Sequence, residues 1–152
     1  MTEIYVDADA CPVKDEVMRV AYRHQLKVHF VSNAFMRLDD SPLVNRVVVP
    51  DGPDVADDWI AEHITLGDIA ITADIPLAAR CVEAKAEALS PNGKPFTKDS
   101  IGMALAMRNL MTDLRETGEI SGHNAAFSKK NRSDFLQALE NMVQNAKRSA
   151  GT

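Results

Sequence analysis

The sequence predicts an α/β fold, a Rossmann-like three-layer sandwich around a mainly parallel sheet. The first observation is that short β-branched runs alternate with segments whose apolar residues recur at helical spacing. The second is the size of the chain, because 152 residues with 45% hydrophobic content are enough for one core. We therefore expect a single domain over residues 1–152, with a helical extension at about 98–148.

The first strand is predicted at residues 3–7, which hold a short β-branched and aromatic run. A helix is predicted over residues 12–24, because Pro12 suits the first turn of a helix. The buried side of this helix is marked by four apolar residues at helical spacing, namely Val13, Val17, Val20 and Ala21.

The middle of the chain repeats the alternation of strand and helix. Asp54 and Asp74 are favoured N-cap residues, and Pro76 falls in the first turn of the helix that Asp74 begins. The sequence predicts strands at 27–32, 44–49 and 68–72, and helices at 54–63 and from 74 to about 84.

The pattern changes in the last part of the chain. A short fifth strand is predicted at residues 86–89, and the Pro, Asn and Gly residues within 90–95 predict a turn. A helix is expected to begin at Asp99 or Ser100 and to carry Ile101, Leu105, Leu110 and Leu114. A loop over 116–130 and a last helix from 133 to about 148 complete the expected order.

The net charge of −5 is unevenly distributed along the chain. Residues 1–80 carry 14 acidic and 7 basic residues, whereas residues 81–152 carry 8 and 10. An acidic half argues against nonspecific binding of nucleic acid over the whole surface, because phosphate backbones need positive charge. A local basic patch beside an acidic site remains compatible with this balance.

The composition also bears on where the protein acts. No run approaches 18 apolar residues, so no membrane span is expected, and the first residues lack the pattern of a signal peptide. Cys11 and Cys81 are the only cysteines, and two thiols without an export signal predict a reduced, cytoplasmic protein. Neither a CxxC motif nor a Cys/His cluster suggests structural zinc.

Polar side chains are predicted to meet at one edge of the sheet. Right-handed crossovers place the carboxyl ends of parallel strands together, and ligands bind there, near the reversal of strand order. Several carboxylates in one cleft repel one another unless they are protonated or bind a cation, and Mg²⁺ or Mn²⁺ prefers such oxygens. The residues expected at this edge are Asp7, Asp9, Ser32, Asn33, Asp54, Asp57, Asp58, Thr72 and Asp74.

Each of these residues also has a purely structural interpretation. Asp54 and Asp74 are suitable helix caps, and Asp57 and Asp58 favour the macrodipole at the start of a helix. Among the basic residues, Lys14 and Arg37 can contact a substrate backbone or belong to the ordinary surface, as can the group Lys129, Lys130 and Arg132. The histidines show no ligand spacing, and Cys11 has no obvious His partner for nucleophilic catalysis.

Several motifs closely resemble the YaiI/YqxD family of uncharacterised bacterial proteins. They are Asp7-Ala8-Asp9-Ala10-Cys11-Pro12-Val13, Val31-Ser32-Asn33, Asp54-Val55-Ala56-Asp57, the stretch from Gly67 to Ala78, Leu89-Ser90-Pro91-Asn92-Gly93 and Met107-Arg108-Asn109-Leu110-Met111. The resemblance implies a PIN-like fold, which many metal-dependent ribonucleases share. It implicates Asp7, Asp57 and Asp74 as catalytic acids, with Asp9 and Asp58 as additional metal ligands.

Three functions are compatible with these residues. The first is a Mg²⁺- or Mn²⁺-dependent phosphodiesterase that cuts RNA, in which Lys14, Ser32, Asn33, Arg37 and Thr72 bind the substrate. The second is a phosphatase like the haloacid dehalogenases, with Asp7 as nucleophile, although its last acidic motif should follow a strand and Asp68 precedes one. The third is a non-catalytic domain that binds RNA or a protein. Nothing in the sequence points to DNA, and the oligomeric state is left open.

Overall fold

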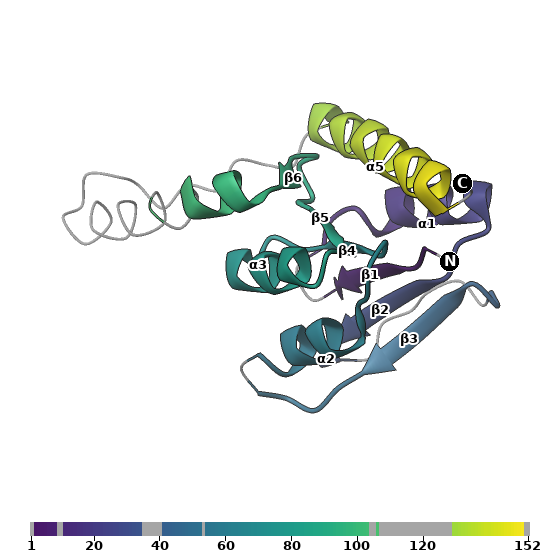
Figure 1. Cartoon of the computed structure of the whole chain (residues 1–152). Helices are drawn as coiled ribbons and strands as arrows, with labels where there is room; N and C mark the ends of the chain where they lie inside the picture. The colour runs from purple at the N-terminus through teal and green to yellow at the C-terminus, as the bar shows by residue number, and fades with distance from the viewer. Residues whose placement is uncertain are drawn as a thin grey trace.

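A computed structural model describes residues 2–8, 11–34, 41–52, 54–103, 106 and 129–150 (Figure 1). The elements in chain order are β1 (Ile4–Asp7), α1 (Lys14–His24), β2 (Val28–Ser32), β3 (Val44–Val48), α2 (Val55–His63), β4 (Ile69–Ile71), α3 (Ile75–Glu83), β5 (Glu87–Leu89), β6 (Pro95–Phe96) and α5 (Lys129–Ala150). Strands and helices therefore alternate through the first two thirds of the chain except at β2 and β3, which follow each other in the element order.

The six strands form one sheet in the order β3-β2-β1-β4-β5-β6. The strands from β1 to β5 pair in parallel, and only β6 runs antiparallel to its neighbour β5. The chain moves outward from β1 to β3 on one side and from β4 to β6 on the other. The strand order thus reverses between β1 and β4, and a crevice for ligands is expected at their carboxyl ends.

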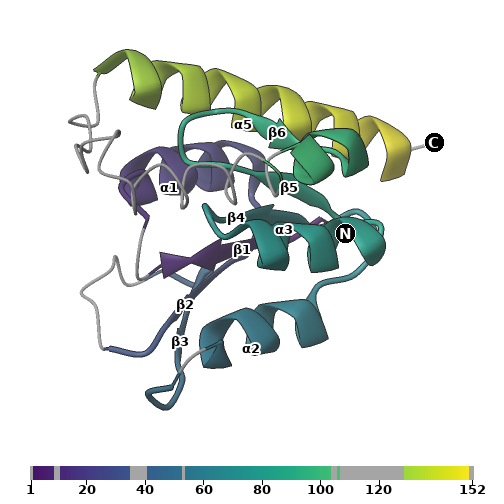
Figure 2. The ribbon, with the colours of Figure 1, turned by 90° about the vertical axis from the view of Figure 1, so that its left-hand side faces the viewer.

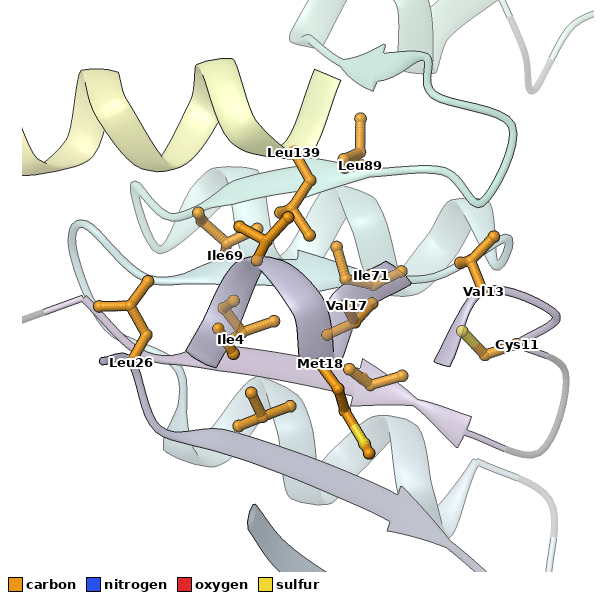
Figure 3. Packing of buried hydrophobic residues seen from close by; sticks show 14 of the residues in the cluster. Ile4, Cys11, Val13, Val17, Met18, Leu26, Ile69, Ile71, Leu89 and Leu139 are labelled. Atoms are coloured by element: carbon orange, nitrogen blue, oxygen red, sulfur yellow. The ribbon is translucent and has the colours of Figure 1, made fainter. Parts of the chain in front are cut away.

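Helices cover both faces of the sheet, which confirms the predicted three-layer α/β arrangement (Figures 1 and 2). On one face, Ile4 and Ile71 of the central strands pack with Val17 of α1 and Leu139 of α5 (Figure 3). Full burial of each such aliphatic side chain contributes about 1.5–3 kcal/mol. Because these parallel strands are buried on both faces, they hold continuous apolar runs rather than an alternating pattern.

On the other face, the strands pack against α2 and α3 through a smaller apolar cluster that includes Ile60 and Leu77. Aromatic rings form part of this layer. Tyr5 stacks on His29 with ring centroids 4.6 Å apart, and Trp59 stacks on His63 at 3.8 Å. The Tyr5 hydroxyl also donates to the backbone oxygen of His63, so β1 is tied to the last turn of α2.

Helix α5 is held against the rest of the domain by both packing and close backbone approach. Phe135 is fully buried, and Glu140 pairs with Arg23 at 3.0 Å and His24 at 2.7 Å from α1. Gly93 has φ of +88°, and a Cβ there would lie 2.8 Å from the carbonyl carbon of Asp134. This turn after β5 therefore requires glycine both for its backbone conformation and for the contact with α5.

Two predicted boundaries near the carboxyl terminus are wrong. The sequence predicts a turn at Pro95, but this residue forms β6 with Phe96. An edge strand tolerates proline because the residue there need not donate a hydrogen bond to the ladder. The last helix begins at Lys129 rather than at residue 133, so the end of the expected loop is helical. Residues 98–103 are helical, so the helix predicted to begin at Asp99 or Ser100 begins at residue 98, whereas Leu105, Leu110, Leu114 and most of the expected loop lie outside the described residues. Across the described ranges, no helix is both long and apolar enough to cross a membrane.

Candidate functional site

The carboxyl ends of β1 and β4 lie side by side at the reversal of strand order. Val6 of β1 pairs with Ile71 of β4, so Asp7 and Thr72 follow at the same level of the sheet. The Thr72 hydroxyl donates to Oδ2 of Asp7 at 3.1 Å, and the Thr72 hydroxyl oxygen in turn accepts from the Asp74 backbone N–H at 2.9 Å. Thr72 is only 1% exposed, so this chain of hydrogen bonds fixes the two ends of the strands relative to each other.

Asp74 is the N-cap of α3, which confirms the structural part of its prediction. Its Oδ1 accepts a hydrogen bond from the Leu77 backbone N–H at 2.8 Å, and Pro76 lies in the first turn. An ionised carboxylate has about four lone-pair positions for acceptance. Capping therefore uses part of the capacity of Asp74 and is compatible with a second ligand.

Helix α2 brings further carboxylates toward this edge. Asp54 takes the N-cap position with φ of +66°, but within the described structure its side chain makes no capping hydrogen bond, contrary to expectation. Asp57 is half-buried in the first turn, and its pKa is raised from 3.8 to about 6. Desolvation is the largest cause, followed by the negative charges of Asp74 and Asp7. Carboxylates from three elements of the fold therefore act on one another.

A pocket of about 290 Å³ opens between α2 and α3, next to these acids. Its lining consists of Asp54, Asp57, Asp58, Asp74, Pro76, Leu77 and Arg80. Asp58 does not extend freely into it, because its Oδ1 accepts a hydrogen bond from Nη1 of Arg80 at 2.7 Å. The pocket is thus acidic, with one ion pair spanning the two helices at its wall.

The donor set fits a hydrated hard cation better than a closed cage. Among the residues that the structure describes, no three His, Cys, Asp or Glu side chains are arranged to hold an ion by themselves. Mg²⁺ commonly keeps several waters and uses only one or two carboxylates of the protein, so Asp7 and Asp74 suit that mode of binding, with the charge of Asp57 nearby. The predicted ligand Asp9 lies outside the described residues.

The remaining predicted substrate contacts are distributed along the same edge or lie beyond the description. Ser32 ends β2 but is 2% exposed, and its hydroxyl bonds with the backbone of Ala34 in both directions. Asn33 is exposed next to it, and Lys14 starts α1 with its amine on the Cys11 carbonyl at 3.3 Å. Arg37 lies outside the described residues. These positions keep Asn33 and Lys14 as the more accessible of the described candidates.

The structure also bears on two further interpretations of the sequence, namely Asp68 as the last acid of a phosphatase and Cys11 as a nucleophile. Asp68 is 4% exposed at the amino end of β4, where it accepts hydrogen bonds from the backbone of Glu3 and Thr65. It therefore lies at the edge opposite the candidate site, which leaves the phosphatase interpretation without its last acid there. Burial raises the pKa of Cys11 to about 11, so its thiol is protonated near neutral pH and is a poor nucleophile.

A larger cavity of about 700 Å³ lies at that opposite edge, between the amino ends of β4 and β5 and the second half of α5. Its lining includes Thr2, Gly67, Lys85 and Glu87, without a cluster of acids. Since ligands of parallel α/β sheets bind at the carboxyl ends of the strands, we place the candidate site at the smaller acidic pocket.

Arg80 is the functional candidate that sequence reasoning missed. It lies six residues after Asp74 on α3 and lines the pocket, but it belongs to none of the motifs noted in the sequence. The one available signal was helical spacing, because Arg80 lies four residues after Pro76 and three after Leu77, on the same face of α3. Its pairing with Asp58 of α2 depends on how two helices meet and has no local signature.

Comparisons with known proteins agree on one family. The model of the family described as "Uncharacterized BCR, YaiI/YqxD family" matches residues 5–145. A UPF0178 protein of Parvibaculum lavamentivorans is 65% identical over 148 residues, covering 97% of both chains. UPF0178 proteins of Rhodopseudomonas palustris and Rhodospirillum rubrum are 62% and 60% identical, covering 95% and 96% of this chain and 91% and 98% of theirs. No solved structure matches the chain.

Proposed function

This chain belongs to the YaiI/YqxD family, and on that premise we propose that it is a phosphodiesterase that depends on a divalent cation and cuts RNA. One observation carries the proposal. Asp7 and Asp74 meet at the reversal of strand order through the Thr72 hydroxyl, and Asp57 lies close enough for its pKa to respond to both charges. The PIN-like relationship implied by the family resemblance is part of the same proposal.

The electrostatics of these acids is better explained by cation binding than by a contribution to the stability of the fold. A carboxylate whose pKa is raised by burial and by neighbouring negative charge disfavours its own ionisation, so the cluster opposes folding slightly at neutral pH. Asp57 has this property, and Asp74 and Asp7 are among its causes. A bound divalent ion reverses the sign of the local field and makes the same arrangement favourable.

Each acid has a separate task in this mechanism. Asp7 at the end of β1 and Asp74 at the N-cap of α3 would hold the ion, and Thr72 keeps Asp7 oriented through its hydrogen bond. Asp57 contributes a third negative charge from α2. When bound, a divalent cation activates water and offsets the charge that develops on a phosphoryl group. The exposed Asn33 and the half-buried Lys14 are suited to holding the substrate backbone along the same edge.

The direct test uses a pair of isosteric substitutions. Pure protein is incubated with a short single-stranded RNA labelled at one end, with Mn²⁺ or with EDTA, and the products are separated on a gel. Asp7→Asn retains an acceptor for Thr72, and Asp74→Asn retains a good N-cap, so the double variant should fold normally. Cleavage should require Mn²⁺ and should fall at least about a hundredfold in the double variant, as expected when groups that stabilise developing charge are removed.

The control for this test is Asp99→Asn, which removes an equal charge from an exposed position. It should cleave like the wild type. Cleavage that persists in the double variant would identify a contaminating nuclease, and absence of Mn²⁺-dependent cleavage in the wild type would contradict the proposal. RNA binding without turnover, unchanged by EDTA, would instead support the non-catalytic alternative.

A further inference from the structure

Arg80 is the one positively charged side chain among the described residues that line the acidic pocket. The other charged residues of the lining are Asp54, Asp57, Asp58 and Asp74. A phosphodiester that approached four carboxylates would be repelled even when one divalent ion is bound. A protein cation in the wall of the pocket offsets part of that repulsion at the position where it is largest.

The ion pair of Arg80 with Asp58 is not explained by stability. The side chains are 46% and 55% exposed, although Nη1 and Oδ1 are 2.7 Å apart. Exposed pairs contribute about 0–1 kcal/mol, so replacing this partner has a low cost. The guanidinium carries five N–H donors in a planar fork, and the bond to Asp58 uses Nη1.

The chemistry of the side chain matches a phosphate rather than a metal ion or a base. Arginine is charged at all relevant pH values and binds phosphate oxygens in pairs, a geometry that lysine does not reproduce. The hydrogen bond to Asp58 and the charges of Asp58 and Asp57 raise the pKa of Arg80 further. The group is therefore a permanent cation that is held within reach of the acids.

We propose that Arg80 binds a phosphate group of the RNA backbone, and that Asp58 holds Arg80 in place until the phosphate displaces it. This inference rests on the proposed function and deepens it by assigning the substrate contact. It also changes the predicted role of Asp58 from metal ligand to partner of Arg80. The competing explanation is that the pair only ties α2 to α3.

The two explanations differ in whether the effect of Asp58→Asn on RNA binding depends on Arg80. If Asp58 competes with phosphate for Arg80, its removal should strengthen RNA binding. If the pair is only a tie between helices, its removal should leave binding unchanged or weaken it. Removing any acid near a polyanion also strengthens binding through simple charge, so the effect must be shown to depend on Arg80, which a double-mutant cycle measures.

The experiment measures binding of a fluorescein-labelled oligouridylate of about ten nucleotides by anisotropy, in Mn²⁺, at several salt concentrations. All proteins carry Asp7→Asn so that the RNA is not cut during the titration. The cycle compares the parent with Asp58→Asn, Arg80→Ala and the combination. Arg80→Lys tests the need for a fork-shaped donor, and Arg19→Ala removes an equal charge from an exposed position on α1.

Arg80→Ala should weaken binding about tenfold, the effect of losing one charge-assisted contact. The slope of log K against log[salt] should become shallower by about 0.7, the value for one phosphate of a single strand. Arg80→Lys should retain the slope and lose part of the affinity. Asp58→Asn should strengthen binding about threefold with Arg80 present and have little effect without it, while Arg19→Ala changes nothing.

Equal binding by Arg80→Ala and the parent, an unchanged salt slope, or an equal gain from Asp58→Asn in both backgrounds would overturn the assignment. So would failure of both the parent and the wild type to bind the oligonucleotide. The proposed function fails separately, through absence of Mn²⁺-dependent cleavage by the wild type. An Arg80-dependent cycle without cleavage would keep Arg80 as a phosphate contact in a non-catalytic protein.

Discussion

The two edges of the sheet use aspartate in opposite ways. At the amino edge, Asp68 is buried and accepts hydrogen bonds from the Glu3 N–H and from both the N–H and the hydroxyl of Thr65, each at 3.0 Å. At the carboxyl edge, Asp57 is half-buried beside other carboxylates, and its pKa is raised to about 6. One acid is surrounded by donors and the other by negative charge.

This difference separates a structural acid from one proposed to be functional, without reference to any motif. A carboxylate whose oxygens are satisfied by the fold stabilises that fold, and nothing further is needed to explain it. A carboxylate held near others of the same sign raises the free energy of the folded state, so its retention points to a ligand that compensates. The comparison can be tested by changing each edge in turn.

Asp68→Asn should have the largest effect on stability. An amide group can accept hydrogen bonds with only one of its ends, so at least one donor of Glu3 or Thr65 faces an NH₂ group and loses its partner. Loss of a buried, charge-assisted contact costs about 3 kcal/mol. Urea denaturation measures it against Asp99→Asn, and a loss below about 1 kcal/mol would remove the distinction between the edges.

Mn²⁺ should stabilise the wild type through the carboxyl edge. At a concentration tenfold above its dissociation constant, an ion that binds only the folded state adds about 1.4 kcal/mol, or roughly 4 °C in the thermal midpoint. Asp7→Asn combined with Asp74→Asn should lose this shift, while Asp99→Asn should keep it. A shift of equal size in the double variant would show that the ion binds elsewhere.

Substitutions of Asp74 separate its two roles. Asp74→Ala removes the cap on Leu77 and should cost about 1 kcal/mol, whereas Asp74→Asn keeps the cap and should be nearly neutral. Both should lose the response to Mn²⁺ and RNA cleavage. Retention of either property by Asp74→Asn would reduce this residue to a helix cap.

Asp57→Asn should be mildly stabilising at neutral pH, by less than about 1 kcal/mol because the group is partly screened by solvent. The pKa of Asp57 in the folded protein, about 6, exceeds its ordinary 3.8, so the folded state binds the proton more tightly than the unfolded chain. The contribution of Asp57 to the free energy of unfolding of the wild type therefore falls as pH rises from about 4 through 6. The advantage of the variant should appear above pH 6 and vanish below about pH 4 in urea titrations. A constant advantage would contradict the raised pKa.

The local pattern of the chain predicted most of the framework. β-branched runs, Asp74 with Pro76 behind it, and helical spacing located nearly every strand and helix of the first 89 residues to within two positions. These signals work because they reflect short-range backbone preferences. The strand order and its reversal between β1 and β4 depend on crossovers of the whole chain. The sequence predicts them only through the general rules for parallel sheets.

The site was harder to predict because its details depend on contacts between elements. The convergence of Asp7 and Asp74 follows from the rule for parallel sheets. The hydrogen bonds through the Thr72 hydroxyl that link them depend on side-chain geometry and have no local signal in the sequence. Asp54 has a favoured cap residue type, yet its αL backbone directs the side chain away from that role. Arg80 belongs to no sequence motif, because its interaction is with Asp58 on another helix.

The stacked pair of Trp59 and His63 gives the protein an intrinsic fluorescence probe. Trp59 is the sole tryptophan of the chain and follows Asp57 and Asp58 directly on α2. Its indole lies parallel to the imidazole within 14°, so emission at wavelengths specific to tryptophan originates from one ring on α2, the helix that contributes Asp57 and Asp58 to the acidic pocket. Occupation of that pocket that shifts α2 can therefore be followed in the unlabelled protein, in real time and without a background from any second indole.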